Sequence, residues 1–135
     1  MATRLAVSLV VASALSVSLA HAEGADVGKG LFDDSCAACH GASGKGDGDM
    51  AGVMTIPAPN LTMLSAGNGG VFPMLKVIHV IDGRTGVRAH GGPMPVFGRV
   101  FSENMMDQGT DYASVLDTRG RVLSLAMYLE SIQAK

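Results

Sequence analysis

The sequence predicts an all-α protein with four or five helices, and three observations lead to this fold class. Apolar residues near the C-terminus recur at intervals of three and four, which is the spacing of one face of a helix. The apolar stretch 72–81 has Pro73 near its start and Gly83 just after its end, an arrangement typical of a helix. The connections between segments are long, and no two segments form a convincing pair of strands.

Residues 1–22 have the pattern of a cleaved signal peptide. Arg4 supplies a positive charge, the run that follows is apolar or small as far as Ala20, and residues 20–22 form an A-x-A cleavage site. An uncleaved membrane anchor is the alternative, but the run is shorter than the roughly 20 apolar residues of a full span. We therefore expect export to the periplasm and one mature domain over residues 23–135.

The composition argues against several classes of protein. With 47% hydrophobic and 16% charged residues, the chain is not expected to be disordered. It carries 12 acidic and 10 basic residues without a basic block, so nucleic acid is not an expected partner. No later apolar run approaches a membrane span. Because the chain is short and has few aromatic residues, we expect something other than its own side chains to fill part of the core.

The first half of the predicted domain combines one helix with long irregular segments. Residues 25–35 form a helix candidate, and the Gly-rich segment 41–52 is a loop because glycine disfavours a helix interior. Residues 56–59 continue in extended form, since each proline disfavours helix at the residue before it. A short helical turn is predicted at 60–65, with Asn60 as its N-cap.

In the second half, residues 72–81 form a helix and 91–98 form a rigid loop with proline on both sides of Met94. The C-terminal helix is the clearest element, with Asp117 as its predicted N-cap. Its apolar face consists of Val122, Leu125, Ala126, Leu129 and Ile132.

The only two cysteines, Cys36 and Cys39, are followed directly by His40. C-x-x-C-H is the attachment pattern of c-type haem. Two thiols at this spacing add to the two haem vinyl groups, and the histidine presents its imidazole to the iron. The motif therefore predicts one covalently attached haem c, with His40 as the proximal iron ligand.

Three other interpretations of the cysteine pair lack their usual context. A thioredoxin-like pair needs a βαβ unit, whereas a Gly-rich loop follows here. A structural zinc site needs a fourth ligand, and no second cysteine pair exists. A disulfide across two residues would close a very small loop and stabilise little. A haem-free redox protein remains an alternative that a haem stain on a denaturing gel would exclude.

Met94 is the predicted distal iron ligand. It lies between Pro93 and Pro95, whose fixed backbone would hold a weak thioether ligand in place. His90, the other methionines and an open sixth site are the alternatives. Met105 and Met106 are the nearest rivals, in a predicted helix, whereas methionines in apolar segments are more simply explained as core residues.

With these residues in place, the sequence resembles the class I c-type cytochromes. Gly28 and Phe32 precede the haem motif at the spacing of that family's N-terminal helix, and Met94 stands 54 residues after His40. The C-terminal helix matches through Leu125, Tyr128 and Leu129. The resemblance implies several helices wrapped around one haem, with an aromatic side chain packed across the N-terminal glycine.

Two features depart from the family pattern. The family has a proline soon after the haem motif, whose carbonyl accepts a hydrogen bond from the histidine. Here Pro57 and Pro59 come later, and either is a candidate for that role. The ring of lysines found around the haem edge of mitochondrial members is absent. Three arginines are candidates to contact the haem propionates: Arg84, Arg88 and Arg99.

The predicted function is single-electron transfer by a periplasmic monohaem cytochrome, with Cys36 and Cys39 anchoring the haem and His40 and Met94 ligating the iron. It is not expected to be an enzyme, and its expected partners are redox proteins, a donor dehydrogenase and an acceptor oxidase or cytochrome. The alternative is a haem protein with a labile sixth site that senses a small ligand or acts as a weak peroxidase.

Overall fold

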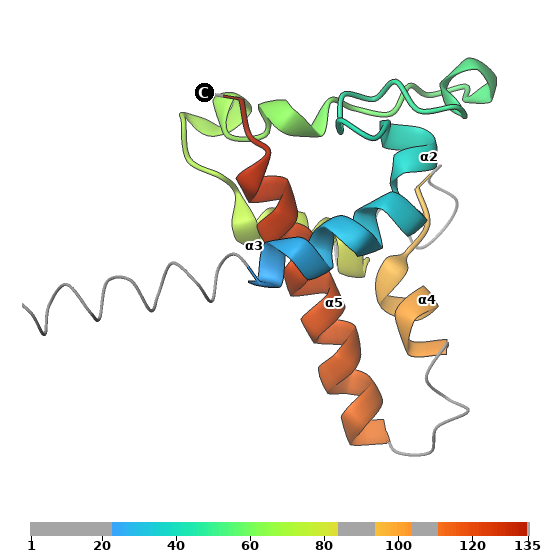
Figure 1. Cartoon of the computed structure of the whole chain (residues 1–135), viewed down its shortest axis with the longest axis vertical. Coiled ribbons are helices and arrows are strands. Elements are labelled where there is room, and N and C mark those ends of the chain that lie inside the picture. The colour runs from blue at the N-terminus through green and yellow to red at the C-terminus, as the bar shows by residue number, and fades with distance from the viewer. Residues whose placement is uncertain (1–22, 84–93, 104–110, 135) are drawn as a thin grey trace, which may run out of the picture.

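Helices make up the framework of the protein (Figure 1). The computed structural model describes residues 23–83, 94–103 and 111–134, and no strand occurs within these ranges. An N-terminal helix covers residues 23–35. The other elements are α2 (Ala37–His40), α3 (Met74–Asp82), α4 (Phe97–Glu103) and α5 (Asp111–Ser131), with 3₁₀ turns η1 (Ala51–Val53), η2 (Leu61–Met63) and η3 (Ala66–Asn68). The all-α prediction is thus confirmed.

The N-terminal helix crosses α5 (Figure 1), and Gly28 lies at the crossing. Gly28 lies against the backbone of Ser124, and a Cβ atom at position 28 would lie 2.8 Å from the Cβ atom of Tyr128. One turn further along, the Phe32 ring packs on the Tyr128 ring with centroids 5.2 Å apart. Glycine is needed here because only a residue without a side chain lets the two backbones approach this closely.

The core lies where α3, α4 and α5 meet the N-terminal helix. Its largest fully buried side chains are Phe32 and Leu125, one from each of the two crossing helices. The C-terminal apolar face predicted from the sequence is buried at Val122, Leu125, Ala126 and Leu129. One long helix therefore serves as the common support for the other elements.

Most of the predicted elements are confirmed. The helix predicted at 72–81 is α3, and Gly83 ends it with a φ of 85°. Asn60 caps η2, since its side-chain oxygen accepts a hydrogen bond from the Thr62 backbone N–H at 2.9 Å. The Gly-rich segment 41–52 is irregular except that η1 begins at its end.

Two predicted boundaries were wrong. α5 begins at Asp111, so Asp117 is not its N-cap but an interior residue that accepts a hydrogen bond from Arg121 at 2.6 Å. The loop predicted at 91–98 ends before Phe97, because Phe97 and Gly98 belong to α4. Burial of the Phe97 ring in the hydrophobic core, which includes residues of α3 and α5, outweighs the local preference of glycine for a loop. No helix among the described residues is long and apolar enough to cross a membrane.

Candidate functional site

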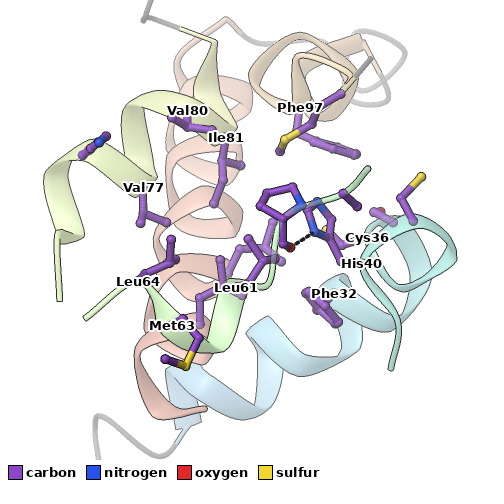
Figure 2. A pocket seen from close by; sticks show the side chains of 18 of the residues that line it. Phe32, Cys36, His40, Leu61, Met63, Leu64, Val77, Val80, Ile81 and Phe97 are labelled. Atoms are coloured by element: carbon purple, nitrogen blue, oxygen red, sulfur yellow. Dashed lines mark hydrogen bonds between the residues drawn. The ribbon is translucent and has the colours of Figure 1, made fainter. Parts of the chain in front are cut away.

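A cavity of about 610 Å³ lies between the N-terminal helix, α2, the segment from Met54 to Leu64, α3 and α5. This volume is within the range of roughly 300–1,000 Å³ found for pockets that bury a cofactor-sized molecule. Its walls are mainly apolar, and Figure 2 shows side chains from these elements pointing into it. The chain thus encloses a space that its own side chains do not fill.

Cys36, Cys39 and His40 all line this cavity. The chain turns at Cys36 between the N-terminal helix and α2, and the His40 N–H donates to the Cys36 carbonyl at 2.9 Å. Both thiols are free and half-buried. Burial, together with the neighbouring Cys39, raises the pKa of the Cys36 thiol to about 11, so this thiol is protonated at neutral pH. The motif predicted from the sequence is therefore assembled on one wall.

His40 is held in one orientation by the backbone of Pro59. Its side chain is buried, and Nδ1 lies 3.2 Å from the Pro59 carbonyl oxygen, to which the Nδ1–H donates. In a histidine that donates through Nδ1, Nε2 is the nitrogen that can bind a metal. Between the two prolines considered from the sequence, Pro59 supplies the carbonyl, whereas Pro57 lines the cavity.

The Gly-rich segment brings Pro59 back to His40. The Gly46 N–H donates to the His40 carbonyl at 2.7 Å, and the Leu61 N–H donates to the Gly44 carbonyl at 2.7 Å. Gly46 has a φ of 88°, and a Cβ atom there would overlap the Ala58 carbonyl oxygen. The insertion after the motif therefore folds back as a hydrogen-bonded loop, which places a proline carbonyl 19 residues from the histidine that it orients.

Met94 lines the same cavity and is half-buried. It approaches from the segment that leads into α4, where the Val96 side chain packs against Gly83. Two further methionines, Met54 and Met63, also line the cavity. They flank Pro59 in the segment that supports His40, whereas Met94 comes from a different part of the chain. Met94 is therefore the methionine that reaches the cavity from a segment separate from the one that supports His40.

The remaining side chains that the sequence suggested as ligands or propionate contacts do not line the cavity in the part of the chain that the structure describes. Arg99 is described but does not line the cavity. The predictions for residues 1–22 and for the following side chains lie outside the described residues: Arg84, Arg88, His90, Pro93, Met105 and Met106.

Sequence reasoning missed Lys76, which lines the cavity from α3. A signal for it existed, because it is the one lysine or arginine in the mostly apolar stretch 72–81.

The donor set and the cavity fit a haem. Two thiols, an oriented imidazole and a thioether line an apolar space of cofactor size, and soft sulfur and imidazole ligands suit haem iron. The family model described as cytochrome c matches residues 25–111, which is more than half of the chain. No curated protein and no solved structure matches this chain. The chain therefore belongs to the cytochrome c family, and its cofactor is haem c, which is covalently attached and contains iron.

Proposed function

We propose that this c-type cytochrome is a monohaem electron carrier, in which Cys36 and Cys39 form the thioether bonds and His40 and Met94 are the axial ligands. The observation that carries the proposal is the convergence of these four side chains on one apolar cavity, with the His40 Nδ1–H satisfied by the Pro59 carbonyl. With His40 and Met94 both binding the iron, no site would be left open for a substrate, and this would suit a carrier better than an enzyme.

Each part of the chain has a distinct role in this function. When bound, the haem supplies a one-electron Fe(III)/Fe(II) couple. Pro59 keeps His40 in the tautomer that presents Nε2, and a soft thioether from Met94 favours the reduced state. The apolar walls, which include Leu125 and Leu129 of α5, exclude water and so disfavour additional charge on the oxidised iron.

The Met94→Ala variant tests the distal ligand. We expect the oxidised wild-type protein to be low-spin with a Met–iron charge-transfer band, and Met94→Ala to lose that band and bind cyanide or CO rapidly. Met63→Ala and Met54→Ala are matched controls, because each removes a thioether from the same cavity and should keep the band.

A band that survives in Met94→Ala would refute Met94 as the ligand. A wild-type protein that is high-spin and binds CO rapidly would support the labile sixth site, and with it a sensor or weak peroxidase.

The proposal extends to location and partners. Residues 1–22 carry the charge, apolar run and cleavage site of an export signal, and c-type haem attachment in bacteria takes place outside the cytoplasm. We therefore place the mature protein in the periplasm, where it carries electrons from a dehydrogenase to an oxidase or another cytochrome. Sequencing the N-terminus of the protein isolated from its native periplasm should give Glu23 as the first residue, and an intact Met1 would contradict export with cleavage.

A further inference from the structure

The position of the haem carboxylates follows from the thioether bonds, so this inference rests on the proposed attachment through Cys36 and Cys39. The vinyl-bearing edge and the propionate-bearing edge of haem lie on opposite sides of the ring. Once two thiols bind the vinyl groups, the ring cannot rotate in its plane. The edge of the ring that carries the two propionates would then lie away from Cys36, towards the opposite wall of the cavity.

That opposite wall is formed by α3. Figure 2 shows Cys36 and His40 on one side of the cavity, with Val77 and Val80 of α3 on the other. Lys76 precedes Val77 and lines the cavity from this wall. It is exposed, so its methylene stem can follow the apolar surface while the ammonium group stays near water.

Lys76 is positioned to pair with these carboxylates. Among the described residues that line the cavity, it is the only lysine or arginine, and no aspartate or glutamate is present to compete for it. Its ammonium group makes no hydrogen bond or ion pair with another described residue. The nearby Asn68 also lines the cavity, and its side-chain nitrogen already donates to the Val71 carbonyl at 2.8 Å.

We propose that Lys76 binds the haem propionates and raises the reduction potential of the iron. Carboxylates near the iron stabilise the oxidised state, which carries one more positive charge than the reduced state. An ammonium group paired with a propionate offsets that effect and favours reduction. Lys76 is therefore a positioning and tuning residue that acts through the carboxylates of the cofactor.

The test is a spectroelectrochemical titration of the holoproteins of wild type, Lys76→Gln, Lys76→Arg and Lys45→Gln. Lys45→Gln removes the same charge from an exposed loop position that does not line the cavity. At a fixed electrode potential we expect Lys76→Gln to raise the ratio of oxidised to reduced protein about threefold to tenfold, where tenfold equals about 59 mV for one electron. Lys76→Arg and Lys45→Gln should stay close to wild type.

Added salt should shrink the difference between wild type and Lys76→Gln, because the pair lies near water. An unchanged potential in Lys76→Gln, or an equal shift in Lys45→Gln, would overturn the proposal. A haem stain and the Met–iron band are recorded for every variant. Both should be retained in Lys76→Gln, so that loss of haem attachment or of Met94 ligation is recognised separately from loss of the propionate contact.

Discussion

The two sides of the cavity hold their candidate ligands by different physical means. On the proximal side, His40 sits in a network of hydrogen bonds that joins its ring to Pro59 and its carbonyl to Gly46. On the distal side, close steric contacts among the described residues help to position the segment that carries Met94, at the junction of α3 and α4. Val96 fills the space beside Gly83, and Gly98 lies against Asp82.

This difference suits the two ligands. An imidazole has two distinct nitrogens, so its tautomer and ring orientation must be specified, and hydrogen bonds are directional enough to do so. A thioether has no proton whose position must be fixed, and it binds iron weakly. It is therefore enough that the backbone of the methionine is held at the right distance from the iron. Mutations that disturb the proximal side should therefore affect stability broadly, whereas mutations on the distal side should affect ligation more than stability.

The largest effect is expected for Gly46→Ala on the proximal side. The φ of 88° at position 46 is strained for alanine, and the added Cβ atom would overlap the Ala58 carbonyl. Backbone strain of about 1–3 kcal/mol and overpacking of about 1–3 kcal/mol predict a loss of roughly 2–6 kcal/mol in the free energy of unfolding. Chemical denaturation of the holoprotein measures it.

Gly52→Ala is the matched control, because no other atom lies within 4 Å of an added Cβ atom there and φ is not positive. It should leave stability nearly unchanged. A similar loss in both variants would show that the hydrogen-bonded loop is not what makes position 46 sensitive.

A smaller effect is expected for Gly98→Ala on the distal side. The added Cβ atom would lie 2.6 Å from the Asp82 carbonyl oxygen, so α4 must shift away from α3. We expect a loss of about 1–3 kcal/mol in unfolding free energy and a weaker Met–iron band, since Met94 precedes α4. Gly120→Ala, a helical position with nothing within 4 Å, should instead stabilise by up to about 1 kcal/mol. Retention of the full band in Gly98→Ala would contradict steric positioning of the distal segment.

The smallest effect is expected at Gln133, which ties the end of α5 to the proximal wall. Its side chain accepts from the Ser65 N–H at 2.8 Å and donates to the Leu61 and Leu129 carbonyls at 2.8 Å and 2.6 Å. Gln133→Ala should cost about 1–2 kcal/mol, because water replaces part of these bonds. Gln133→Glu should be less stable still at neutral pH, since a carboxylate oxygen would face two carbonyls. Thermal unfolding of both variants checks the order, and a Glu variant as stable as wild type would rule out the donated bonds.

The sequence was informative wherever a residue has one dominant local preference. Gly83 after an apolar stretch predicted the end of α3, and Asn60 predicted the cap of η2, because caps depend on only a few neighbouring residues. It failed at Asp117, where an equally good capping residue lies inside a helix and pairs with Arg121 instead. It also failed at Phe97, because burial of that ring against distant helices decides where α4 begins.

By itself, the sequence determined the helical class and the C-x-x-C-H motif. Each of these depends on the chemistry of single residues or on short, regular spacings. Only the tertiary structure decided that Pro59 and not Pro57 orients His40, that Met94 shares its cavity with Met54 and Met63, and that Lys76 stands on the wall opposite Cys36. These placements depend on how the Gly-rich loop folds back and on how the helices pack against one another. Both are determined by contacts between residues that are distant in the chain.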